Sequence, residues 1–243
     1  MATAIIALAT RDFDPTEAAV PWRVLTEAGH EVRFATADGA PGAADSDMLD
    51  GVLFGQIKAL PQHAQDYAAM AASPAFSTPI RYADLDPAVH DLLVLPGGHA
   101  QGMRQYLEDP DLQAAVARFF RIDAPVGAIC HGTIVLARSN HPDTGAPVIA
   151  GRTLTGLPKR FEMGAWILTK PTRGDYFRTY PEWVQDEVKQ ALGPDGSWQP
   201  GPFLPLHGEG FVVVDRNLVT ARWPGDAERF SAALVELLDQ RTP

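Results

Sequence analysis

The first 36 residues constrain the fold more than any other part of the chain. Residues 1–9 are almost all apolar and predict a strand, and residues 17–28 predict a helix that Thr16 caps and that ends at Gly29. Residues 31–36 alternate polar and apolar side chains and predict a second strand. A helix that joins two strands in this way connects parallel neighbours. The sequence therefore predicts an α/β fold with a mostly parallel sheet.

The same kind of pattern continues along the chain. Short apolar runs predict strands at residues 91–95, 125–129, 152–156, 211–214 and 218–221, and helical composition predicts helices at 61–72, 111–122, 159–169, 180–192 and 226–238. The last two strands flank a short polar turn and predict a hairpin. No repeat or break in composition divides the chain, so we expect a single domain over residues 1–243.

The only cysteine, Cys130, stands between the apolar run 125–129 and a helix predicted to follow it. In α/β hydrolases a sharp strand-to-helix turn of this kind exposes the nucleophile. A helix N-terminus and the adjacent His131 both favour the thiolate and would lower the thiol pKa. The alternative is a buried cysteine that acts as a small hydrophobic residue. The adjacent histidine and the flanking glycines favour a nucleophile.

A second candidate segment, Gly97-Gly98-His99, follows the strand predicted at residues 91–95. The N–H groups of these glycines, with that of His131, can form an oxyanion hole. The alternative is a plain turn after a strand. His99 is a candidate to line the pocket, although a histidine in a loop is more often simply solvated.

Composition excludes several functional classes. The net charge is −10 and no basic cluster is present, so neither nucleic acid nor a membrane surface is an expected partner. The N-terminus lacks the basic region of a signal peptide, and a single cysteine fits a reducing compartment, which together predict a cytoplasmic protein. His63 and Asp66 have a metal-ligand spacing on one helix face, but two residues do not make a zinc site, and we expect no metal.

Four separated segments carry a resemblance to a known family. They are residues 17–21, 95–99, 128–132, and 151–156 together with 217–221. In this order they resemble the ThiJ/PfpI family, within the class I glutamine amidotransferase-like superfamily. The Cys-His-Gly sequence is most similar to the chaperone-like glyoxalase III branch.

This resemblance implies a flavodoxin-like three-layer sandwich with helices on both faces of the sheet, and a homodimer. It places Glu17 beside Cys130, where the carboxyl must be protonated because two anions in one dry pocket repel each other. It gives Glu162 the place of an acid that orients His131. The alternatives are an ordinary first-turn glutamate at 17 and an exposed helix carboxylate at 162. Residues 166–205 match nothing in the family and indicate an insertion that shapes the pocket.

The resemblance implies a cysteine-dependent, cofactor-independent enzyme that acts on a small carbonyl compound, as glyoxalase III converts methylglyoxal to lactate without glutathione. Cys130 is the expected nucleophile, and Glu17 and His131 are expected to move protons. One alternative is a cysteine hydrolase or amidase, in which His207 of His207-Gly208-Glu209 would serve the cysteine. Another is a stress-related holdase chaperone or an oxidation sensor.

Overall fold

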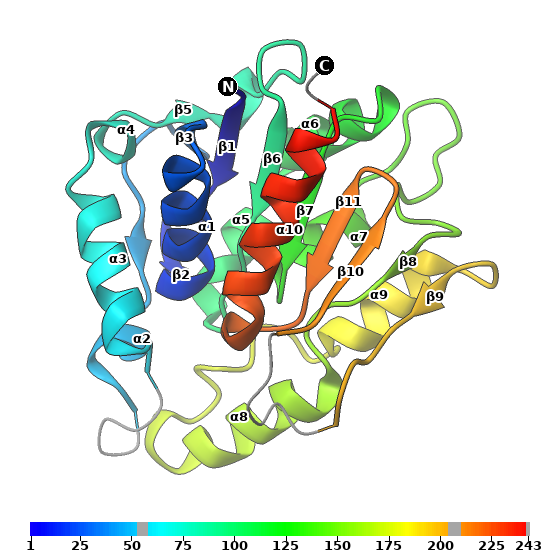
Figure 1. Cartoon of the computed structure of the whole chain (residues 1–243). Helices are drawn as coiled ribbons and strands as arrows, with labels where there is room; N and C mark the ends of the chain where they lie inside the picture. Colours follow the sequence, from blue (N-terminus) through cyan, green and yellow to red (C-terminus); the bar gives the residue numbers. More distant parts are fainter. Residues whose placement is uncertain (53–57, 204–209, 242–243) are drawn as a thin grey trace.

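The computed structural model describes residues 1–52, 58–203 and 210–241. Among these residues, a sheet of seven strands runs through the middle of the molecule in the order β10-β11-β7-β6-β1-β3-β5 (Figure 1). Its members are β1 (Thr3–Ala7), β3 (Glu31–Thr36), β5 (Ile80–Arg81), β6 (Leu92–Leu95), β7 (Val126–Ile129), β10 (Val212–Asp215) and β11 (Leu218–Ala221). Every neighbouring pair is parallel except the β10–β11 hairpin. The prediction of an α/β fold with a mostly parallel sheet is confirmed.

Helices cover both faces of this sheet and complete the three layers. One face carries α1 (Pro15–Glu27), α3 (Pro61–Ala71) and α10 (Ala227–Asp239); the other carries α5 (Arg104–Leu107), α6 (Pro110–Arg121) and α7 (Gly132–Arg138), with α9 (Val184–Leu192) packed on α7. Strands β6, β7 and β11 are buried at every residue, because helices cover the sheet on both sides.

The remaining elements are short or lie outside these layers. They are β2 (Arg11–Phe13) paired with β4 (Ala43–Ala44), β8 (Thr153–Leu154) paired with β9 (Ser197–Trp198), α2 (Ser46–Asp50), α4 (Pro74–Ser77), α8 (Lys159–Arg173) and 3₁₀ turns at Tyr82–Asp84, Gln101–Met103 and Pro224–Asp226. In the part of the chain that the structure describes, no helix has the length and apolar character that crossing a membrane requires.

The N-terminus of α1 differs from its prediction in one respect that matters for the site. The capping side chain is Asp14, whose Oδ1 accepts hydrogen bonds from the N–H groups of Thr16 and Glu17 at 2.8 and 3.0 Å. Pro15 occupies the first turn, where its missing N–H costs no hydrogen bond. The helix therefore begins earlier than predicted, and Glu17 lies in its buried first turn.

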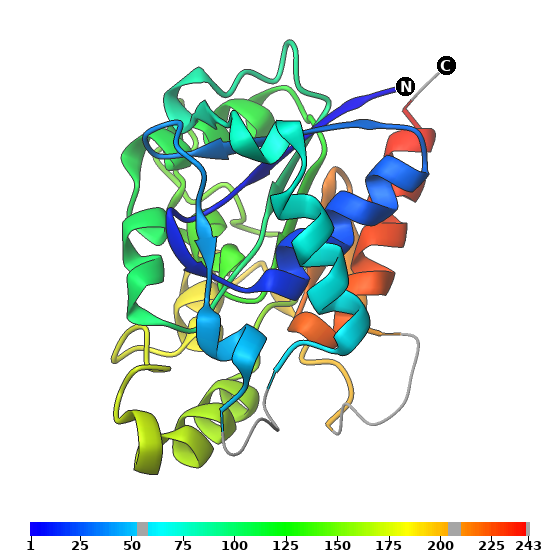
Figure 2. The same ribbon diagram turned by 90° about the vertical axis from the view of Figure 1, so that its left-hand side faces the viewer.

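Helix α8 lies along the edge where the parallel strands end, and it is below the sheet in both views (Figures 1 and 2). Its C-terminal end is held to α2, because Arg173 donates two hydrogen bonds to the carboxylate of Asp47, at 2.6 and 2.9 Å. Loops that follow parallel strands meet at this edge, which is where α/β proteins place their ligands. The segment 166–205 adds the second half of α8, then α9 and β9; that it is an insertion in a single domain stays a prediction.

Candidate active site

Cys130 occupies a strained turn between β7 and α7. Its φ is +57°, a left-handed conformation that costs a residue with a Cβ atom about 1–2 kcal/mol. The backbone holds it there: its N–H donates to the carbonyl of Ala221 on β11 at 3.1 Å, and a Cβ atom at Gly132 would collide with the carbonyl oxygen of Leu95. The predicted strand-to-helix turn is present, and it directs the thiol to the carboxyl edge of the sheet.

Glu17 reaches the same place from α1. Its Oε2 accepts a hydrogen bond from the N–H of Gly97, just after β6, at 2.8 Å. A Cβ atom at Gly97 would lie 2.6 Å from the backbone nitrogen of His131 and 3.0 Å from the Cβ of Cys130, so this position has no room for a side chain. The Gly97 N–H is engaged by Glu17, and a role in an oxyanion hole would require that bond to be exchanged.

Burial keeps the carboxyl of Glu17 protonated. The pKa of Glu17 is raised well above its usual range, first by removal from water and then by the nearby Asp14 carboxylate. The pKa of Asp14 is itself raised to about 6 by burial, against the opposing hydrogen bonds from Thr16 and Glu17. The second oxygen, Oε1 of Glu17, is buried and has no hydrogen-bond partner among the described residues. The proton that the sequence requires on Glu17 is therefore expected in the resting protein.

The thiol differs from its prediction. Burial raises the pKa of Cys130 well above its usual value, and the neighbouring carboxyl groups of Glu17 and Asp14 raise it further, although a hydrogen bond from the N–H of His131 opposes them. The pKa of the His131 imidazole is lowered well below its usual value, chiefly by burial. The expectation of a lowered thiol pKa is wrong because the sulfur is fully buried. The resting pair is a neutral thiol beside a neutral imidazole.

Thr179, which the sequence did not indicate, determines the tautomer of His131. The threonine hydroxyl donates to the carbonyl oxygen of His99 at 2.5 Å, and it lies 3.1 Å from His131 Nε2. Because its one proton is used, the hydroxyl must accept the N–H of Nε2. The lone pair of His131 is then on Nδ1, which lies 3.5 Å from the Cys130 sulfur. The imidazole is thus set to take a proton from the thiol.

Glu162, on the first turn of α8, is buried beside His131 and is not an exposed helix carboxylate. Its Oε1 lies 4.0 Å from His131 Nε2, a distance too long for a hydrogen bond. The same oxygen accepts a hydrogen bond from Arg178 at 3.0 Å. Its Oε2 accepts the N–H of Val184 at 3.0 Å, and burial raises its pKa to about 7. Glu162 therefore lies near the imidazole of His131 without a hydrogen bond to it, and Thr179 is the direct hydrogen-bond partner of the imidazole.

His99 completes the cluster around the sulfur. Its ring centroid lies 5.0 Å from that of His131, and burial lowers its pKa to about 4. One ligand atom each from His99, Cys130 and His131 lie within 4.8 Å of one another, a set that could bind a soft cation such as zinc through a thiolate and two neutral imidazoles. That the protein uses no metal stays a prediction. Gly98 lies against the carbonyl of Asp12, where a Cβ would approach to 2.5 Å.

The other histidines noted in the sequence lie elsewhere. His63 Nε2 is 3.4 Å from the carboxylate of Glu228, and Asp66 pairs with Arg23 at 3.1 Å, so both belong to a network of ion pairs. His207, the alternative partner for the thiol, lies outside the described residues.

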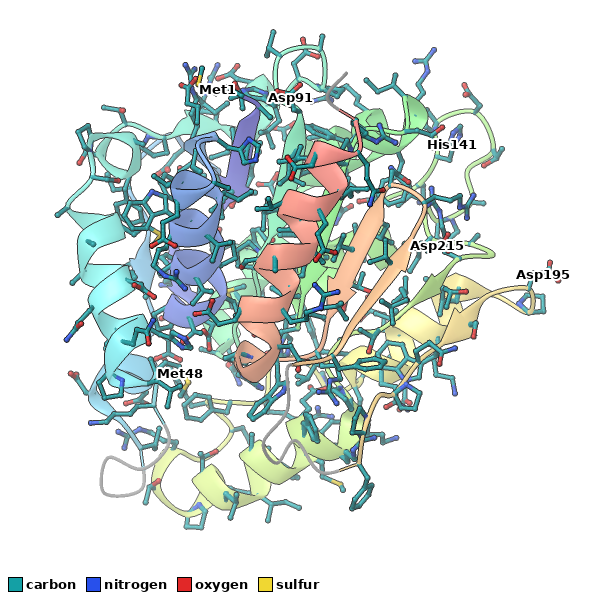
Figure 3. All side chains as sticks on the ribbon, viewed as in Figure 1. Met1, Met48, Asp91, His141, Asp195 and Asp215 are labelled. Carbon is teal, nitrogen blue, oxygen red and sulfur yellow. The ribbon has the colours of Figure 1, made fainter. Side chains whose placement is uncertain are left out.

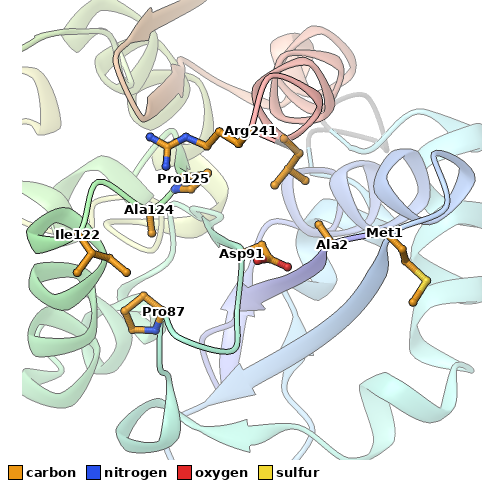
Figure 4. A pocket seen from close by; sticks show the side chains of 9 residues that line it. Met1, Ala2, Pro87, Asp91, Ile122, Ala124, Pro125 and Arg241 are labelled. Atoms are coloured by element: carbon orange, nitrogen blue, oxygen red, sulfur yellow. The ribbon is translucent and has the colours of Figure 1, made fainter. Parts of the chain in front are cut away.

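Two hollows lie at opposite edges of the sheet. One, of about 520 Å³, is at the carboxyl edge and is lined by the start of α1, His99, Met48 and the inner side of α8. The other, of about 380 Å³, is lined by residues that precede β1, β6 and β7, among them Met1 and Asp91 (Figure 4). Figure 3 shows Asp91 at the top of the molecule and Met48 in its lower left part. Only the first hollow adjoins the cluster around the cysteine.

Comparison with known proteins agrees with this arrangement. The family model described as "ThiJ/PfpI family-like" matches residues 8–202 of the chain. The chain belongs to this family. A similar relative of this ThiJ/PfpI-like protein is Glyoxalase 3 of Candida albicans, 26% identical over 213 residues, which cover 87% of this chain and 83% of the relative. Deglycase PfpI of Pyrococcus furiosus is 26% identical over 96% of this chain and 98% of the relative. The crystal structure of glyoxalase III from Candida albicans has the same fold, with a TM-score of 0.70, 20% identity and 97% coverage of both chains.

In this ThiJ/PfpI-like protein, Thr179→Val is expected to lower kcat by about tenfold. The variant leaves the buried N–H of His131 without its acceptor, and an unsatisfied buried donor costs about 1–3 kcal/mol. The loss also frees the other tautomer, in which Nδ1 carries the proton and cannot accept one from the thiol. The kcat should be measured across pH 5–9, with Thr179→Ser as the matched control because it keeps the hydroxyl. Equal loss in both variants would assign Thr179 a packing role only.

Proposed function

We propose that this protein is a cysteine-dependent, cofactor-independent enzyme that converts 2-oxoaldehydes to 2-hydroxy acids without glutathione, as glyoxalase III does with methylglyoxal. The observation that carries the proposal is the contact between the Cys130 sulfur and Nδ1 of His131, with a protonated Glu17 on the same sulfur. Relatives named glyoxalase and deglycase support a carbonyl substrate. An enzyme of this kind needs one nucleophile and two proton carriers, and in this proposal Cys130, His131 and Glu17 supply them.

The reaction begins at a neutral thiol. As the sulfur attacks the aldehyde carbon, its proton passes to Nδ1 of His131, and the carbonyl oxygen gains a proton to give a hemithioacetal. The hydrogen on the former aldehyde carbon is then removed as a proton, and a proton is delivered to the adjacent carbon through an enediol. The product of this step is a thioester, in which one carbon has been oxidised and its neighbour reduced. Water cleaves the thioester, so the sum is one 2-oxoaldehyde and one water giving one 2-hydroxy acid.

The side chains of the site divide the proton transfers and the positioning between them. His131 accepts the thiol proton, because its other nitrogen already donates to Thr179. Glu17, which holds a proton in the resting state, is placed to supply one to the substrate oxygen and to carry the carbon-bound proton afterwards. Glu162 and Arg178 hold the loop that carries Thr179, since their ion pair at 3.0 Å joins α8 to it.

Two of the alternatives, an oxidation sensor and a hydrolase, gain no specific observation in the described part of the structure, and the holdase chaperone stays an untested alternative. An oxidation sensor uses an accessible thiolate, and here the sulfur is buried with a raised pKa. A hydrolase that uses His207 would need that residue at the thiol, where His131 already lies at 3.5 Å.

The direct test mixes purified protein with methylglyoxal, without glutathione, and measures lactate with a lactate-specific assay. We expect lactate to form in a one-to-one ratio with the methylglyoxal consumed. The matched control is Cys130→Ala, which should consume methylglyoxal only at the rate of its reaction with surface side chains. Consumption without lactate, at the same rate in both proteins, would contradict the proposal.

A further inference from the structure

The hollow at the carboxyl edge is far larger than methylglyoxal needs. Its volume of about 520 Å³ lies within the range of about 300–1,000 Å³ that holds drug-sized ligands. Most of its described lining is apolar: Leu157, Phe161, Ala165, Leu168 and Trp223 form its walls. These apolar walls contribute no binding free energy for a three-carbon substrate that does not contact them.

This cavity adjoins the cluster around the cysteine. Asp14 and Thr16, at the start of the helix that holds Glu17, belong to its lining together with His99. His99 also belongs to the cluster whose ligand atoms lie within 4.8 Å of one another, and it is partly exposed whereas Cys130 is fully buried. His99 therefore lies between the described lining of the cavity and the cluster around the sulfur.

The charge of the lining differs from that of the whole protein. The chain has a net charge of −10, yet the described lining holds two cations, Lys58 and Arg160, and one carboxyl, Asp14. Arg160 donates from Nη2 to the carbonyl oxygens of Pro200 and Pro202, at 3.2 and 2.7 Å. Its Nε is buried and has no hydrogen-bond partner among the described residues. A guanidinium in this state is suited to a carboxylate.

We propose that the cavity selects 2-oxoaldehydes that carry an aromatic or branched alkyl group and a carboxylate, with the apolar group against α8 and the carboxylate at Arg160. This inference rests on the proposed function, since it takes Cys130 as the nucleophile. The chemistry is unchanged: one aldehyde and one water give one 2-hydroxy acid.

The substrate test compares initial rates for methylglyoxal, phenylglyoxal and 4-carboxyphenylglyoxal. The aldehyde is added last, because arylglyoxals also react slowly with arginine. Replacing a methyl by a phenyl adds five carbons, and if about half of their surface is buried against α8, kcat/KM is expected to rise about 30-fold. The added carboxylate is expected to raise it about a further tenfold. Arg160→Met should remove the increase in kcat/KM due to the carboxylate and keep the increase due to the phenyl group.

Gly164 offers a matched pair of variants on α8. It lines the cavity, and a Cβ atom there would meet nothing within 4 Å, so Gly164→Leu places a side chain in the open space. We expect kcat/KM for phenylglyoxal to fall at least about tenfold and that for methylglyoxal to change less than about twofold. Ile167→Phe, an exposed position on the same helix that is not part of the described lining, is the control and should change neither.

Two outcomes separate this inference from the proposed function. If methylglyoxal is turned over as efficiently as phenylglyoxal, the selectivity is overturned and the proposed function stands. If no aldehyde is turned over, the proposed function fails, and calorimetry with phenylglyoxylate and pyruvate tests the cavity alone. Phenylglyoxylate is then expected to bind about 30-fold more tightly than pyruvate, with the difference lost in Gly164→Leu; equal affinities would overturn the inference.

Discussion

Cys130→Ser is expected to lower kcat/KM for 2-oxoaldehydes by at least about 10³-fold, nearly as much as Cys130→Ala. An alcohol holds its proton far more tightly than a thiol, and a neutral His131 is too weak a base to remove it. The described site also offers no cation beside the sulfur that could compensate, since the nearest groups are a protonated carboxyl and two neutral imidazoles. The measurement is lactate or mandelate formation under single-turnover conditions.

Both variants should fold normally, because Cys130 is a small buried residue and its left-handed turn is imposed by the backbone. Their melting temperatures provide the control for folding. The wild type mixed rapidly with phenylglyoxal and quenched in acid should carry the mass of one thioester adduct on the peptide that contains Cys130, and both variants should lack it. Activity above a tenth of wild type in Cys130→Ser would contradict a covalent role for the sulfur.

The neutral resting state has a consequence for the pH profile. Because the thiol pKa is raised and the imidazole pKa is lowered, Cys130 stays a neutral thiol and His131 a neutral imidazole over a wide range around neutral pH. Activity therefore does not depend on forming a thiolate in the free enzyme. Two carboxyl groups near the site titrate in this range: Asp14, whose pKa is raised to about 6, and Glu162, whose pKa is raised to about 7. Ionisation of Glu162 strengthens its pair with Arg178.

Local patterns in the sequence predicted most of the fold. The strand predicted at residues 31–36 has the same bounds as β3, and burial alternates over its first four residues, whereas residues 34–36 are all buried. The stretch 38–50 shows what local patterns miss. It contains β4 and the one-turn helix α2, which depend on the partner strand β2 and on the Asp45 cap. Short elements of this kind have too few residues to show a period.

The candidate site was predictable only in part, for a physical reason. Cys130, His131 and Glu17 belong to recognisable segments, and the structure brings them together. Thr179 is 48 residues from His131 in sequence and lies in the segment 166–205, so nothing local signals its contact. The neighbours of Cys130 in sequence, a helix terminus and a histidine, favour a lower thiol pKa. Its burial depends on the packing of distant elements, and desolvation outweighs the helix terminus.

Glu17→Gln is expected to lower kcat by about 10²–10⁴-fold and to raise the stability of the protein at neutral pH. Glutamine keeps an oxygen that can accept the Gly97 N–H, so the loop after β6 stays in place. It cannot lose or supply a proton at neutral pH, so both proton transfers assigned to Glu17 stop. The binding of a non-reacting probe such as phenylglyoxylate should be unchanged, which separates lost catalysis from lost binding.

The stability gain follows from the direction of the pKa shift. The folded protein raises the pKa of Glu17 above its unfolded value of 4.5, so the carboxyl contributes fully to stability below that pH, and its contribution falls as pH rises toward the folded pKa. A glutamine in its place does not titrate, so the difference in unfolding free energy between Glu17→Gln and wild type should widen from pH 4.5 to pH 8 in urea titrations. Glu17→Ala is the control: it also removes the carboxyl but leaves the Gly97 N–H without an acceptor, and it should be less stable than Glu17→Gln at every pH. A glutamine variant with wild-type kcat would contradict the assignment of Glu17 as the proton carrier, whatever its stability.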